Sequence, residues 1–158
     1  MDRGKYITRL AIERVGGIVD GQVVEYDFCQ TDAGRCLSKR PKQKNDCTVR
    51  ATATAFELSY DDAYDILKKY GRICGRGFHI GDFLIDKKAE KISFQAVKGQ
   101  RRMHPWKFCK EYNNGKYICR TAGHVFAVID GVVFDTIAPS VDRCIYKAWK
   151  IRTKRGIL

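Results

Sequence analysis

The segment GHVFAVIDGVVFDT, residues 123–136, predicts a two-stranded antiparallel hairpin. Its Asp130-Gly131 pair stands between two runs of β-branched and aromatic residues, which is the strongest short-range signal for a two-residue hairpin turn. A turn of that length fixes the pairing of the strands, and side chains directly opposite each other share a face. In this register His124 and Asp135 are diagonal neighbours on one face, within reach of each other. We therefore expect the two side chains to interact.

The segment QKNDCTVRATATAF, residues 43–56, contains the start of a helix that we expect over residues 47–58, beginning at a cysteine. Asn45 and Asp46 are favourable residues at a helix N-terminus, so we expect Cys47 in the first turn. The unpaired amides and the helix dipole at that position favour a thiolate over a thiol. The negative charge of Asp46 opposes the thiolate unless its carboxylate points away. The alanines that follow allow close packing on several sides, which is typical of a central helix.

Together, the two segments supply the three roles that thiol catalysis needs. In this hypothesis Cys47 is the nucleophile, His124 the base and Asp135 the residue that orients the histidine. Each pattern alone also fits a plainer interpretation, namely a buried small cysteine, a structural histidine and a turn-capping aspartate. The combination favours catalysis, because the other two histidines, His79 and His104, have no comparable neighbours in the sequence.

The rest of the chain predicts an α+β fold. The expected elements are strands over residues 5–28 with a turn at Asp20-Gly21, a basic loop over 29–46, a helix capped at 59–61 and ending at Tyr70 before Gly71, a glycine-rich loop over 71–81, a strand over 91–97, a helix over 105–112 that starts at a proline, and strands joined by tight turns over 115–149. Helices precede most of the strands, as in α+β domains. The length of 158 residues indicates one domain, with residues 1–40 as a β-rich N-terminal extension.

The chain is strongly basic. It carries 30 Lys and Arg against 18 Asp and Glu, which gives a formal net charge of +12. Such a charge attracts acidic proteins, nucleic acid or anionic lipid, although a solvated basic surface is the plainer interpretation. Trp106, Tyr146 and Trp149 lie among basic residues and could stack on bases. No RNA-binding signature accompanies them, so nucleic acid is the less favoured partner.

The cysteines and the N-terminus indicate a reducing compartment. Seven cysteines cannot all pair within the chain. The first ten residues contain no apolar signal segment, and no stretch reaches the ~18 apolar residues that span a bilayer. We therefore expect a cytoplasmic protein with reduced thiols and no contact with a membrane. No cysteines have the C-x-x-C spacing of structural zinc sites, so we expect no metal and no other cofactor.

The order of Cys47, His124 and Asp135, with the cysteine opening a helix and the histidine opening a strand, resembles the papain-like cysteine peptidase superfamily. The QKNDC and GHVFAVIDGVVFDT segments are most similar to its bacteriocin-leader-peptidase-like branch, in which an aspartate is the third residue. The NDCTVRA segment followed by SYDDAYDIL also resembles small phage-encoded proteins, for which the compartment would be the host cytoplasm. The resemblance covers residues 43–149 loosely, and residues 43–67 and 123–136 carry it.

The resemblance implies one papain-like domain over residues 1–158, with the helix that carries Cys47 packed on an antiparallel sheet. It also implies a hydrolase that cleaves a peptide or isopeptide bond of a protein substrate through a thioester intermediate. The oxyanion glutamine usually lies six residues before the cysteine, where this chain has Pro41. Gln43 is the nearest glutamine and the candidate for that role, with Asn45 or a backbone amide as alternatives. Thr48 stands where a glycine usually follows the nucleophile.

Two other functions remain open at this point. An NlpC-type cell-wall amidase would use the same residues on a different substrate. A non-catalytic basic module on the same scaffold would bind nucleic acid or an acidic host protein. The sequence does not predict the oligomeric state.

Overall fold

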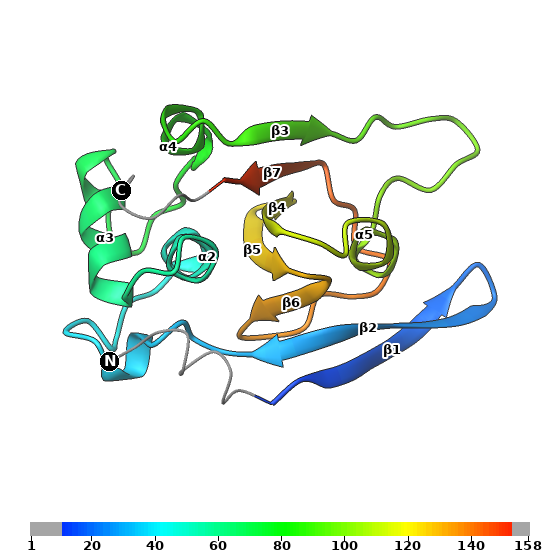
Figure 1. The fold of residues 1–158 in the computed structure, drawn as a ribbon, viewed down its shortest axis with the longest axis horizontal. Helices are drawn as coiled ribbons and strands as arrows, with labels where there is room; N and C mark the ends of the chain where they lie inside the picture. Colours follow the sequence, from blue (N-terminus) through cyan, green and yellow to red (C-terminus); the bar gives the residue numbers. More distant parts are fainter. Residues whose placement is uncertain (1–10, 153–158) are drawn as a thin grey trace.

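The computed structural model describes residues 11–152 of the chain and confirms the α+β class. Within these residues, a seven-stranded sheet combines with four α-helices (Figure 1). In chain order the elements are β1 (Glu13–Val19), β2 (Gln22–Gln30), a 3-10 turn (Arg35–Leu37), α2 (Cys47–Ala55), α3 (Tyr60–Lys69), α4 (Gly81–Asp86), β3 (Glu90–Ser93), α5 (Pro105–Glu111), β4 (Lys116–Thr121), β5 (His124–Ile129), β6 (Val132–Asp135) and β7 (Lys147–Ile151).

The β5–β6 hairpin lies at the centre of the sheet, whose strand order is β1-β2-β6-β5-β4-β7-β3. The predicted register is confirmed from Ile129 opposite Val132 to Ala127 opposite Phe134. Both turn residues, Asp130 and Gly131, have positive φ angles, of 49° and 77°. A two-residue hairpin turn of type I′ requires this conformation, which explains the Asp-Gly pair.

The N-terminal strands are an integral part of the sheet rather than an extension of it. β1 and β2 form the predicted hairpin around Asp20-Gly21. β2 then pairs in parallel with β6, so that Gln30 lies opposite Asp135. The amide of Thr31 also donates to the carbonyl of Asp135 at 2.9 Å. The strand that carries Asp135 is therefore held on both sides. The part of the prediction that falls on residues 5–10 lies outside the described residues.

Helices cover both faces of the sheet, with α2, α3 and α4 on one side and α5 on the other (Figure 1). On the α2 side, Val49 and Ala53 pack in one buried cluster with Ala127 and Phe134. On the α5 side, Phe108 packs in a second cluster that includes Phe126, Val128 and Val133. Seven of the nine residues of α2 are buried, which confirms that its small side chains suit a central helix.

The second helix begins and ends as predicted. The Ser59 hydroxyl accepts a hydrogen bond from the Asp62 amide at 3.1 Å and so caps α3. Gly71, with a φ of 99°, follows that helix. The glycine-rich loop is confirmed up to Ile80, and α4, which buries Phe83 and Leu84, follows it. Two other predictions differ from the structure. The strand predicted over 91–97 ends at Ser93, and a long connection rather than a tight turn links β6 to β7.

A larger side chain in the middle of α2 should destabilise the protein. Ala53 is a residue of α2 that packs in the cluster between this helix and the sheet, and it is fully buried. We expect Ala53→Leu to lower the free energy of unfolding in urea by about 1–3 kcal/mol, because a close-packed core has no space for the added atoms. The matched control is Ala96→Leu at an exposed position, for which we expect a change within about 0.5 kcal/mol. Equal effects of the two substitutions would contradict the central position of α2.

Candidate active site

Cys47 is the first residue of α2 and lines a cavity of about 580 Å³. Burial raises the pKa of its thiol, but a hydrogen bond with His124, the backbone N–H of Val125 and the charges of His124 and Arg50 outweigh that effect. The net result is a pKa below the ordinary value of a thiol. The thiolate is the reactive form of cysteine, so this environment activates Cys47 as a nucleophile.

His124 is the first residue of β5, and its ring lies between Cys47 and Asp135. The Nε2 atom of the ring is 2.6 Å from Oδ2 of Asp135. This bond leaves Nδ1 as the ring nitrogen available to the thiol. The hydrogen bond to Asp135 and the contact with Cys47 raise the pKa of His124 to about 9, although burial acts against them. At neutral pH the ring is therefore an imidazolium beside an activated thiol.

Asp135 is the last residue of β6, and its side chain is 4% exposed. Its Oδ1 atom accepts from Nη1 of Arg50 at 2.5 Å and from the amide of Thr136 at 2.7 Å. Burial raises the pKa of this carboxyl, but His124 and Arg50 lower it more, so the net shift is downward. Asp135 is thus a permanent carboxylate that can orient the imidazolium. The predicted meeting of His124 with Asp135 is what the structure shows.

Strand alternation alone does not place these two side chains beside α2. Alternate positions on the hairpin, Phe126 and Val133, pack in the cluster on the α5 side. However, His124 begins its strand and Asp135 ends the neighbouring one, beyond the last paired residues of the β5–β6 ladder. At this end of the sheet both side chains reach the first turns of α2, where Cys47 and Arg50 lie.

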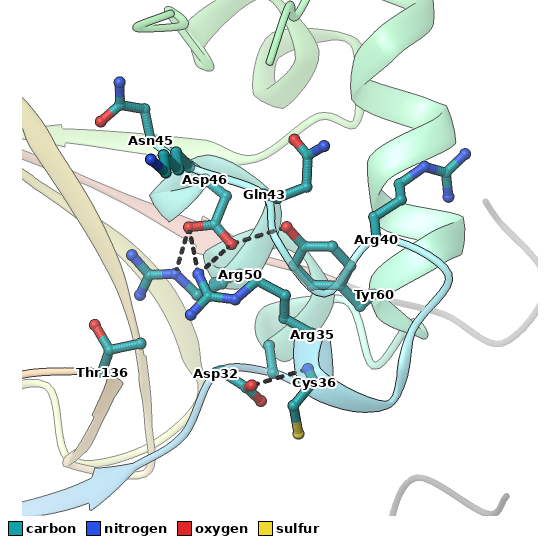
Figure 2. Close-up of polar contacts among 12 residues, drawn as sticks. Asp32, Arg35, Cys36, Arg40, Gln43, Asn45, Asp46, Arg50, Tyr60 and Thr136 are labelled. Carbon is teal, nitrogen blue, oxygen red and sulfur yellow. Dashed lines mark hydrogen bonds and ion pairs between the residues drawn. The ribbon is translucent and has the colours of Figure 1, made fainter. Parts of the chain in front are cut away.

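Arg50 links the two segments of the site, and it was not predicted. Its Nε atom donates to Oδ1 of Asp46 at 3.1 Å, while its Nη1 atom donates to Asp135. Asp46 is 3% exposed and also accepts from Nη1 of Arg35 at 3.0 Å and from the hydroxyl of Tyr60 at 2.8 Å, as Figure 2 shows. Only the i,i+4 spacing of Asp46 and Arg50 could have been recognised in the sequence.

These partners remove the objection that Asp46 opposes a thiolate at Cys47. Burial raises the pKa of Asp46, but the hydrogen bond from Tyr60 and the charges of Arg50 and Arg35 lower it by more. The net pKa is below the ordinary value, so the carboxylate is charged and fully paired. Two guanidinium groups neutralise it. Asp46 stands at the N-cap position of α2, yet its side chain makes no capping hydrogen bond, contrary to the predicted cap. Its role here is to hold Arg50 and Arg35.

Gln43 does not line the cavity, whereas Asn45 does. Oε1 of Gln43 accepts from Nη1 of the buried Arg72 at 3.3 Å. The other terminal nitrogen of Arg72 lies 3.4 Å from the carbonyl oxygens of Lys44 and Asn45, so this arginine organises the loop before the cysteine. Asn45 has a φ of 51° and donates through Nδ2 to the Gly75 carbonyl at 2.8 Å. No second hydrogen bond of this side-chain amide occurs within the described residues.

The remaining walls of the cavity come from the loop before α4 and from the sheet. The lining residues are Asn45, Asp46, Cys47, Thr48, Arg50, Gly77, Phe78, His79, Ile80, Gly81, Arg120, Gly123, His124, Val125 and Trp149. His79 therefore lines the same cavity as Cys47, although no motif around it in the sequence indicated a place in the site. Four of the lining side chains are arginine or histidine, and Asp46 is the single acidic one among the residues described.

No three His, Cys, Asp or Glu side chains in the range of residues 11–152 are grouped so that they could hold a metal ion. The seven cysteines, all of which lie in the range, are unpaired. None of the helices that the structure describes has the length and hydropathy needed to cross a membrane.

Comparison of the chain with protein-family models, curated proteins and solved structures gives no match. The case for a function therefore depends on the geometry and chemistry of the site itself.

The pairing of His124 with Asp135 predicts that the imidazole pKa of His124 is raised and that it depends on the Asp135 carboxylate. We expect NMR titration of His124 to give a pKa of about 9 in the wild-type protein. Asp135→Asn removes the negative charge, so the pKa should fall towards the ordinary value of about 6.5. A wild-type pKa near 6.5 would contradict the pairing.

Proposed function

We propose that this protein is a papain-like cysteine hydrolase that cleaves a peptide or isopeptide bond. The observation that carries the proposal is the hydrogen bond between Asp135 and His124 beside a Cys47 thiol of lowered pKa, with Cys47 and His124 at the wall of one cavity. Nucleophile, base and orienting carboxylate are the parts that thiol catalysis requires. Residues with strongly perturbed pKa values in a cavity are typical of catalytic sites.

The arrangement of the elements supports the papain-like assignment. A cysteine begins a helix that packs on an antiparallel hairpin, the histidine begins one strand of that hairpin, and the aspartate ends the other. The resemblance found in the sequence implies this same arrangement.

In the proposed mechanism, the Cys47 thiolate attacks the substrate carbonyl while His124 is protonated. The carbon–sulfur bond forms as the carbonyl π electrons move to oxygen. The amide of Cys47 and the free N–H of Asn45 would stabilise that oxyanion, and one such donor typically contributes ~10²–10³ in rate. This assigns to Asn45 the role first considered for Gln43, which is held by Arg72. His124 then protonates the leaving amine, and the carbon–nitrogen bond breaks to give a thioester.

Water completes the cycle. His124, now neutral, takes a proton from the water, and the resulting hydroxide attacks the thioester. Collapse of the second tetrahedral intermediate releases the acid and returns the sulfur as a thiolate beside the imidazolium. Asp135 holds the same ring orientation through both steps, since its bond to Nε2 does not depend on the substrate.

A binding module without catalysis accounts less well for this site. Two buried carboxylates, Asp46 and Asp135, and the half-buried Arg50 between them are costly to remove from water and seldom stabilise a fold more than apolar residues would. Their arrangement around Cys47 is explained if they hold His124 in position to activate the thiol. An NlpC-type amidase would share all the chemistry above and differ only in the amide that it cleaves.

The reactivity of Cys47 tests the proposal without a known substrate. We expect iodoacetamide to alkylate Cys47 rapidly down to about pH 6, because His124 holds the sulfur as a thiolate. His124→Ala should slow alkylation at that pH by about tenfold or more, since the pKa of the thiol then returns towards about 8.5. Asp135→Asn should act in the same direction but less. Peptide mass spectrometry measures the rate at each cysteine.

The exposed Cys74 and Cys144 are controls within the same sample. Their rates should not respond to the His124 substitution. If Cys47 reacts no faster than these two and ignores the loss of His124, the protein is not a thiol hydrolase.

A further inference from the structure

Arg120 is a wall residue of the cavity that the mechanism does not use. It lies on β4, two residues after Ile118, whose side chain packs on the α2 side of the sheet. Alternation along the strand therefore gives Arg120 the same face as Cys47 and the helix that carries it. No described carboxylate lies within salt-bridge distance of its guanidinium, in contrast to Arg50. Its charge is thus available to a ligand.

The positive charge continues from Arg120 onto the neighbouring strands. Lys147 on β7 is directly opposite Arg120 in the sheet. Lys91 on β3 is opposite Trp149, which places it diagonally from Lys147 on the same face. Trp149 itself lines the cavity. We call Arg120, Lys147 and Lys91 the basic strip. It runs across β4, β7 and β3, which lie side by side in Figure 1.

Three cations side by side on one face of a sheet are unfavourable without an anion. Like charges at opposite positions of adjacent strands destabilise the pairing. The charge of Lys91, together with some desolvation and the charge of Arg120, lowers the pKa of Lys147. Within the cavity, the single acidic wall residue, Asp46, is already paired with two arginines. No described carboxylate therefore relieves the basic strip.

We propose that the basic strip is a substrate subsite that binds acidic side chains of the peptide cleaved at Cys47. This inference rests on the proposed function, and it names the substrate class. Adjacent strands lie about 4.8 Å apart, so the strip extends about 10 Å from β4 to β3. An extended peptide covers that distance with about three residues. Substrates should thus carry two or more Asp or Glu within about four positions of the cleaved bond.

The surface fits an acidic peptide better than a nucleic acid. Binding of single strands depends on exposed aromatic rings on which bases stack. Of the two aromatic residues that line the cavity with Arg120, Trp149 is 4% exposed, and the half-buried Phe78 packs against the core on the α2 side. Carboxylates need only the cations, which form charge-assisted hydrogen bonds with them.

The first test measures the local charge at Cys47. The ratio of its alkylation rates with anionic iodoacetate and neutral iodoacetamide reports the potential at the sulfur, whether or not the thiol is catalytic. We expect the double variant Arg120→Gln/Lys147→Gln to lower this ratio several-fold. The matched control is Lys107→Gln/Lys110→Gln, which removes two exposed cations from α5 on the other face and should leave the ratio unchanged. Equal ratios in both double variants would overturn the proposal.

The second test measures peptide binding on Cys47→Ala protein by fluorescence anisotropy of a labelled deca-glutamate peptide. We expect salt-sensitive binding that the Arg120→Gln/Lys147→Gln change weakens about tenfold or more, with no binding of the matched deca-glutamine peptide. A single-stranded oligonucleotide of equal charge is the competitor. Stronger binding of that oligonucleotide than of the glutamate peptide would overturn the acidic-peptide assignment.

The two proposals fail in different ways. Loss of glutamate binding only in the Arg120 and Lys147 variant, with Cys47 insensitive to His124→Ala, would show that the basic strip binds acidic peptides and would refute the hydrolase. Fast alkylation that depends on His124, with glutamate binding unaffected by the basic-strip substitutions, would refute the subsite and leave the hydrolase.

Discussion

The buried carboxylate of Asp135 is the interaction on which the site depends. It accepts from Arg50 on α2 and bonds to His124 on β5, so one side chain joins the helix to the hairpin. A buried charge must be compensated by partners, and removing one partner typically costs about 3–5 kcal/mol. The position of Cys47 relative to the imidazole of His124 therefore follows from electrostatic pairing as well as from the packing of the small residues of α2 against the sheet.

Charges of alternating sign extend that pairing through the protein. Arg35 pairs with Asp46, Asp46 with Arg50, Arg50 with Asp135, and Asp135 with His124. This series of charged side chains ends at Cys47, whose thiolate adds one more negative charge and continues the alternation. The same arrangement leaves the cavity with a surplus of positive charge towards Arg120. The site thus combines an activated nucleophile with a potential that attracts acidic ligands.

Local patterns made the hairpin and the cysteine helix predictable, because an Asp-Gly turn fixes its own register and an Asp-Cys pair indicates a helix start. The contacts that the sequence did not reveal are long-range. Arg50 donates to Asp135, which is 85 positions away in the chain, and Arg72 donates to Gln43, which is 29 positions away. His79 reaches the cavity from a loop whose course no periodic pattern describes. The β1–β2 hairpin was recognised, but its parallel pairing with β6 depends on the tertiary fold.

The ultraviolet absorbance of the Cys47 thiolate tests the central claim most directly, as the difference between wild-type and Cys47→Ser protein across the pH range. The structure predicts that this absorbance persists below the ordinary thiol pKa of about 8.5. Arg50→Gln, which weakens the support of Asp135, should move the transition to higher pH. A Cys47 transition near 8.5 that does not respond to Arg50→Gln would contradict the account.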